Sequence, residues 1–210
     1  MTGPRDAARQ ELLARVRAAV RGATPPAIPR TYRRHGEHQP GSAALLDLLT
    51  DRLVDYRATV HRRTAEQLAA TVSAVLTDAI PAGGRVIVPP GLRSGWVDGA
   101  VADHAGLSAA DLDGFAAVVT GCAAAVADTG TIVLDGSPDQ GRRAITLVPD
   151  VHVCVVRADQ VVQTVPEVLA RLDPRRPLTF ISGPSATSDI ELTRVEGVHG
   201  PRRLHVVLVG

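Results

Sequence analysis

Residues 58–88 read ATVHRRTAEQLAATVSAVLTDAIPAGGRVIV, and they decide the fold because they contain a strand, a helix and a second strand in succession. The helix is predicted by TAEQ at 64–67, which is a capping box, and by apolar residues that recur at helical spacing from Leu68 to Leu76. PAGG at 81–84 ends the helix, and RVIV at 85–88 is typical of a buried strand. Units of this kind are joined by right-handed crossovers, so the stretch predicts an α/β fold with a mostly parallel sheet.

The same alternation continues on both sides of this unit. A stripe of leucines predicts a helix over 43–57, and a second capping box at Thr164 predicts a helix over 164–172. Two short helices are expected at 95–104 and 108–113. Further strands are expected at 115–120, 123–127, 131–134, 145–148, 151–156, 178–181 and 204–209.

The N-terminal part of the chain has a different character. Residues 5–21 show an amphipathic helical pattern that ends at Gly22, and the stretch that follows, 23–41, is rich in Pro and Gly and has no period. We therefore predict a helical arm with its linker over residues 1–42 and an α/β domain over residues 43–210.

Composition excludes several classes of function. The 210 residues have a net charge of +1 and only 2% aromatic residues, so we expect neither a nucleic-acid partner nor binding to a membrane surface. All 23 basic residues are arginine, which excludes Schiff-base chemistry and a Walker A loop, because each needs a lysine amine. No apolar stretch reaches the length of a membrane-spanning helix, and the N-terminus lacks the apolar segment of a signal peptide.

The two cysteines, Cys122 and Cys154, each stand alone in an apolar run. A cubane iron–sulfur cluster needs four thiolates, and structural zinc usually needs four Cys or His ligands at short spacing. We therefore expect this chain to bind no metal and no cofactor of its own. We interpret the cysteines as buried, reduced thiols of a cytoplasmic protein.

Two polar loops that contain glycine follow strands in the second half of the chain, ADTGT at 127–131 and SGPSATSDIE at 182–191. Their backbone N–H groups and hydroxyls are suited to holding a small anion, although the same residue types also make ordinary turns and helix caps. Ligands of open α/β sheets bind beyond the carboxyl ends of strands, and the second loop begins where the strand at 178–181 ends. These loops are the predicted binding site.

A third segment, GVHGP at 197–201, places His199 between two glycines. A histidine there can act as acid, base or anion partner, or it can be a structural residue bonded to a carbonyl. His152, inside an apolar strand, is given no role. The sequence contains neither G-x-S-x-G nor G-x-G-x-x-G, so neither a nucleophile elbow nor a Rossmann site is expected. The candidate catalytic residues are Asp128, Glu191 and His199, and the candidate ligand-binding residues are Thr129, Gly130, Thr131, Ser182, Gly183, Ser185, Thr187, Asp189 and Gly200.

These segments resemble a known family. ISGPSATSDIE at 181–191, GVHGP at 197–201 and LHV at 204–206 closely resemble the C-terminal signature of the LUD-domain family, of the lactate-utilisation protein C (YkgG) type. DTGTIVL at 128–134 resembles the ETGTIVL element of that family, with Asp128 in place of the glutamate. The resemblance implies a three-layer α/β/α fold of the NagB/RpiA/CoA-transferase-like type. It also implies a role in oxidising L-lactate to pyruvate, shared with two partner proteins that carry iron–sulfur motifs.

Three hypotheses for the function follow. The leading one is a cluster-free subunit of a lactate-oxidising system, which binds a small anionic ligand or a partner where the three loops meet. The second is a stand-alone enzyme related to CoA transferases or phosphosugar isomerases, in which Asp128 or Glu191 supplies a carboxylate. The third is a scaffolding subunit without chemistry. The leading hypothesis requires the three loops to lie together in space.

Overall fold

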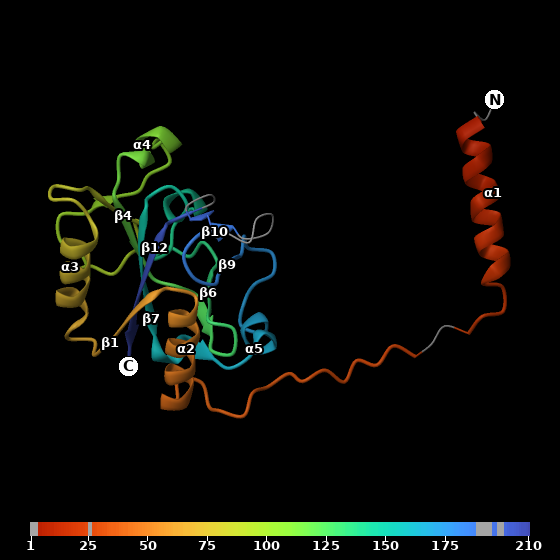
Figure 1. Cartoon of the computed structure of the whole chain (residues 1–210), viewed down its shortest axis with the longest axis horizontal. Coiled ribbons are helices and arrows are strands. Elements are labelled where there is room, and N and C mark those ends of the chain that lie inside the picture. The colour runs from red at the N-terminus through yellow and green to blue at the C-terminus, as the bar shows by residue number, and fades with distance from the viewer. Residues whose placement is uncertain (1–3, 25–26, 188–194, 197–199) are drawn as a thin grey trace. The chain divides into compact units, whose positions relative to one another are not determined.

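The computed structural model describes residues 4–24, 27–187, 195–196 and 200–210 (Figure 1). Contacts divide the chain into two units, Met1–Tyr32 and Arg33–Gly210. The first unit contains the predicted helix, α1 (Pro4–Ala19), and its Leu12 and Val16 side chains are exposed. None of the helices in the described part of the chain is both long and apolar enough to cross a bilayer.

The larger unit is built on a sheet of six strands, all paired in parallel, in the order β1-β12-β7-β4-β2-β3 (Figure 1). The longest pairing joins β7 and β12, from Arg203 opposite Val151 to Val209 opposite Arg157. The strands are β1 (Thr59–Arg63), β2 (Val86–Val88), β3 (Val101–Ala102), β4 (Ala117–Thr120), β7 (Val151–Arg157) and β12 (Arg203–Val209).

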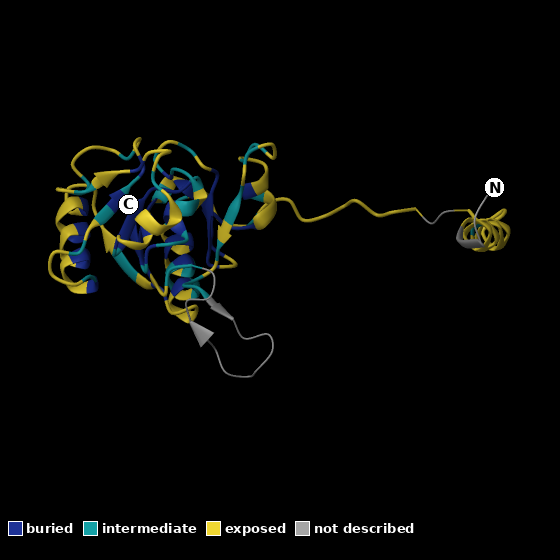
Figure 2. Cartoon of the chain, turned by 90° about the horizontal axis from the view of Figure 1, so that it is seen from above, coloured by how far each residue is buried: buried dark blue, intermediate teal, exposed yellow. Residues whose placement is uncertain are grey.

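Helices cover both faces of this sheet. Successive side chains of a strand point to opposite faces. Val153 and Val155 of β7 therefore pack with α3 (Leu68–Ala79), whereas Cys154 and Val156 pack with α2 (Ala43–Asp55). In Figure 2 dark blue gathers in the interior of the domain, and the outer surfaces of the helices are yellow. The predicted three-layer α/β/α architecture with a mostly parallel sheet is confirmed.

A second, smaller sheet lies in the same layer as α2, and the sequence did not predict it. Its strand order is β8-β5-β6-β9, and Ala125 of β5 and Ile132 of β6 share a core cluster with Leu49 of α2. The remaining elements are β5 (Ala124–Val126), β6 (Thr131–Leu134), β8 (Val161–Val162), β9 (Thr179–Ile181), β10 (Ala186–Thr187), β11 (Val195–Glu196), α4 (Ala109–Asp113), α5 (Val165–Leu169), and the 3-10 helices η1 (Arg143–Thr146) and η2 (Ala158–Gln160).

Two predicted elements are wrong. The helix expected at 95–104 does not form, because Gly95 and Gly99 have φ values of +84° and +67°, which a right-handed helix excludes. The strand expected at 145–148 does not form: Ile145, which is completely buried, and Thr146 end η1, and residues 147–148 lie in a turn. A short apolar run has no period that separates a strand from a buried helical turn.

Candidate functional site

Two of the three predicted loops are joined by hydroxyl groups. The Oγ1 atoms of Thr129 and Thr131 lie 2.8 Å apart, and Thr131 Oγ1 lies 2.8 Å from Ser182 Oγ. This contact arises because β6 and β9 pair antiparallel with Ile132 opposite Ile181, which places the start of one strand beside the end of the other. The structure therefore places the loop at 127–131 beside Ser182, the first residue of the second predicted loop.

The glycines of these two loops serve close packing against the end of α2. Gly130 and Gly183 have φ values of +58° and +87°, which favour glycine. A Cβ atom on Gly130 would lie 2.8 Å from Arg52 Cβ, and one on Gly183 would lie 2.7 Å from the Tyr56 carbonyl oxygen. Their shared structural role is to let both loops approach α2.

Asp128 contacts residues that belong to neither of the other two loops. Its backbone N–H donates to the Gln163 carbonyl, and its carboxylate is 3.8 Å from Arg33 Nη2. Arg33 begins the larger unit, so the segment after it lies against the α/β domain: the backbone N–H groups of Glu37 and His38 donate to Gln163 Oε1 at 2.7 and 3.0 Å. The domain boundary at residue 42 stays a prediction of the sequence.

This attachment gives a first testable result. Replacing Gln163 with alanine removes the acceptor of both N–H groups, so the segment at 33–42 is expected to open more often, with a loss of about 1 kcal/mol of local stability. Amide hydrogen exchange at Glu37 and His38 measures the effect. Gln39→Ala, an exposed glutamine in the same segment, is the matched control. Unchanged exchange at both amides in Gln163→Ala would contradict this account of the attachment.

A pocket of about 280 Å³ lies between the second and third loops, and we call it the serine-loop pocket. The segments 182–185 and 200–201 line it, and they are tied together because the Ser185 N–H donates to the Pro201 carbonyl at 2.9 Å. Residues 127–131 do not line this pocket. The first loop is linked to it indirectly, because Thr131 contacts Ser182, which is a lining residue. Two of the three predicted loops thus share one pocket.

The pocket also contains residues that the sequence analysis missed. Arg143 of η1 is exposed and contributes a positive charge, and among the described residues it has no ion-pair partner. His152 is 1% exposed, and its Nε2 lies 2.8 Å from Thr120 Oγ1. Burial lowers the pKa of His152 to about 4, so the ring is neutral at pH 7 and can form hydrogen bonds without carrying charge. The sequence signal that could have pointed to His152 is that it is a polar residue within the apolar strand VHVCVV at 151–156.

The position of the pocket corrects one premise of the prediction. The loop at 182–191 follows β9, which belongs to the small sheet and not to the parallel one. His152 and Leu204, which line the pocket, are paired with each other near the amino ends of β7 and β12. The serine-loop pocket therefore does not lie at the carboxyl ends of the parallel strands.

The remaining candidates are only partly placed. Asp189, Glu191 and His199 lie outside the described residues. Thr187 is described only as the end of β10, which pairs antiparallel with β11, and Gly200 lines the serine-loop pocket. The roles assigned to all these residues stay predictions.

Cys122 and Cys154 are buried free thiols, as predicted, but they are not isolated from each other. A side-chain hydrogen bond with Cys154, together with burial, raises the pKa of Cys122 well above its usual value. A protonated thiol is a poor nucleophile and a poor metal ligand. Within the described ranges, no group of three or more His, Cys, Asp or Glu side chains is arranged to hold a metal ion.

Comparisons with known proteins show the family to which this chain is similar. The LUD domain model matches residues 100–209. Lactate utilization protein C of Deinococcus radiodurans is 46% identical over 211 residues, which cover 97% of this chain and 96% of that protein. Lactate utilization protein C of an Exiguobacterium species is 37% identical over 94 residues, 41% of this chain and 40% of that protein. The crystal structure of a DUF162 family protein from Deinococcus radiodurans superposes with a TM-score of 0.68 and 44% identity, covering 80% of this chain and 98% of that one.

Proposed function

The chain belongs to the LUD-domain family, and from this premise we propose that it is the cluster-free subunit of a system that oxidises L-lactate to pyruvate together with iron–sulfur partner proteins. The observation that carries the proposal is the 46% identity, over nearly the whole chain, to a protein named for lactate utilisation. A place in the cytoplasm is part of the proposal, because reducing conditions there keep Cys122 and Cys154 as thiols.

The serine-loop pocket supports the binding of a small carboxylate. Arg143 supplies a cation with several N–H donors, and Ser182 and Ser185, which carry hydroxyls, also line the pocket. His152, neutral at pH 7, adds a group that can donate or accept one hydrogen bond. In this proposal the pocket holds and orients the substrate carboxylate.

Oxidation of lactate releases two electrons and two protons, which must pass to acceptors. Two cysteines are too few for a cubane cluster, so the electrons pass to clusters that the partners hold. Glu191 and His199 are the predicted acceptors of the protons, whereas Asp128, the third candidate, does not line the serine-loop pocket. In this proposal, this chain therefore binds the substrate and its partners transfer the electrons.

The test combines genetics with purification. A strain that lacks this gene is expected to lose growth on L-lactate and to keep growth on pyruvate, and the tagged chain is expected to co-purify with proteins that carry iron–sulfur absorption. Arg143→Gln is expected to restore growth poorly, whereas Arg62→Gln, at the opposite end of the sheet on β1, is expected to restore it fully. Unchanged growth of the deletion strain on lactate, with no cluster-bearing protein in the purified sample, would refute the proposal.

Thermal-shift measurements address the enzyme alternative. Stabilisation by L-lactate agrees with the proposed subunit. A shift with a CoA ester or a sugar phosphate, together with turnover by the purified chain alone, would favour a stand-alone transferase or isomerase.

A further inference from the structure

A second cavity, of about 630 Å³, adjoins the serine-loop pocket, and we call it the arginine cavity. Three arginines line it: Arg142, Arg143 and Arg176. The two cavities share Arg143, together with Thr146 and Thr179. Arg143 therefore lines both cavities.

The arginine cavity lies where ligands of open parallel sheets usually bind. Pro90 follows β2, and Asp103 and His104 follow β3 directly, so these lining residues stand beyond the carboxyl ends of two parallel strands. This is the position that the sequence analysis expected for a ligand, but a different set of residues occupies it.

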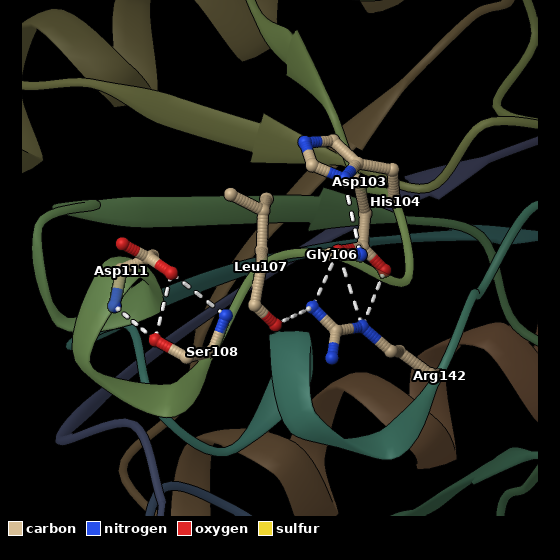
Figure 3. A network of polar contacts seen from close by, with 7 residues as sticks. All are labelled: Asp103, His104, Gly106, Leu107, Ser108, Asp111 and Arg142. Atoms are coloured by element: carbon tan, nitrogen blue, oxygen red, sulfur yellow. Dashed lines mark hydrogen bonds and ion pairs between the residues drawn. The ribbon is translucent and has the colours of Figure 1, made fainter.

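Buried carboxylates hold two of the arginines in place. Arg142 Nε lies 2.8 and 3.1 Å from the two carboxylate oxygens of Asp103, and its Nη2 donates to Asp103 and to the Leu107 carbonyl (Figure 3). The Nη1 atom of Arg142 carries no dashed line to any residue drawn in Figure 3. Arg176 Nη1 lies 3.0 Å from Asp135 Oδ2. Both guanidinium groups are thus oriented before any ligand arrives.

The exposed fractions show which partner of each pair is open to solvent. The Asp103 and Asp135 side chains are 5% and 12% exposed, whereas those of Arg142 and Arg176 are 36% and 39% exposed. Both carboxylates are thus largely removed from solvent, although Asp103 also lines the cavity, whereas the two arginine side chains remain partly exposed. Arg143, the third arginine of the lining, is exposed and has no ion-pair partner among the residues that the structure describes.

The loop that carries Arg142 is itself fixed. Gly136 and Gly141 have φ values of +68° and +70°, so the loop needs glycine at both positions. The Gly91 N–H donates to the Pro138 carbonyl at 3.0 Å, and a Cβ atom on Gly91 would lie 2.4 Å from Pro138 Cβ. This close approach fastens the loop to the segment that follows β2.

We propose that the arginine cavity binds the phosphate group of a phosphorylated ligand. Phosphate suits this site because its several oxygens can accept from more than one guanidinium group, and arginine matches that geometry. The site goes beyond the proposed function, which needs only a small carboxylate in the neighbouring pocket. Because Arg143 lines both cavities, a ligand in one changes the affinity of the other.

Calorimetric titration of the full-length chain with pyrophosphate, in the absence of divalent metal ions, tests the proposal. We expect one site per chain. Arg176→Gln and Arg143→Gln each remove charge-assisted hydrogen bonds and are expected to weaken binding about tenfold, whereas Arg143→Lys, which keeps the charge, weakens it less. Arg62→Gln is the matched control, because it removes one exposed arginine charge on β1.

Several outcomes decide the matter. Absence of pyrophosphate binding, or equal weakening in Arg62→Gln and Arg176→Gln at unchanged melting temperature, would overturn the site, since the second result reports only net charge. Tighter binding of ADP or of coenzyme A than of pyrophosphate supports the site and identifies the organic part of the ligand. Failure of the proposed function is distinguishable: the deletion strain then grows on lactate, while pyrophosphate still binds and still depends on Arg176.

Discussion

Replacement of His152 with glutamine is expected to make the protein less sensitive to acid. The folded pKa of about 4 lies below the usual value of 6.5, so the unfolded chain binds a proton at this residue before the folded chain does. His152 therefore does not lower the free energy of unfolding above pH 6.5, and below that pH it lowers it progressively as the pH falls toward 4. At 1.36 kcal/mol per pKa unit, this loss of folding stability amounts to about 2 kcal/mol at pH 5 and about 3 kcal/mol at pH 4.

Urea unfolding of the wild type and the variant at pH 7 and pH 5 measures this term. Burial also lowers the pKa values of His61 and His205, so both proteins lose stability in acid, and only the difference between them reports His152. Glutamine retains a group that can bond to Thr120 Oγ1, which limits the loss at pH 7. His35→Gln, in the exposed segment before the domain, is the control. If the wild type and His152→Gln lost equal stability between pH 7 and pH 5, the neutral buried ring would be disproved.

The elements that could be predicted from the sequence are those whose signals are local. The run at 58–88 forms β1, α3 and β2 as expected, because capping residues, helical spacing and terminating glycines all act within a few residues. The strands of the small sheet at 123–127, 131–134 and 178–181 were also located. Their assembly into a separate sheet was not predicted, because strand pairing depends on contacts between segments far apart in the chain.

The candidate site shows the same difference between features with a local sequence signal and features that depend on contacts between distant segments. Thr129, Thr131 and Ser182 were chosen for their loop chemistry, and antiparallel pairing of β6 with β9 brings them together. Arg143 has no local signal, because it lies in a stretch expected to lead into a strand, and His152 has only a weak one, as a polar residue in an apolar strand. Arg143 reaches the site because it belongs to η1, and this 3-10 helix places it in the lining of both cavities.

Arg142→Met is expected to destabilise the protein by about 3 kcal/mol, because it leaves the Asp103 carboxylate buried without its counter-charge. The value lies at the low end of the range for broken buried pairs, since Arg142 itself is open to the cavity while Asp103 is only 5% exposed. Methionine replaces much of the volume of the arginine stem, so the loss reports charge and hydrogen bonding more than packing.

The second half of the experiment is a double-mutant cycle. Asp103→Asn in the Arg142→Met background removes the unpaired charge and is expected to recover much of the stability, whereas Asp103→Asn alone is expected to lower it. Urea unfolding at pH 7 gives all four free energies. A loss below about 1 kcal/mol in Arg142→Met, or no recovery in the double variant, would show that the pair does not support the fold. The expected coupling would mean that the same carboxylate stabilises the loop at 135–142 and orients the arginine that it carries toward the cavity.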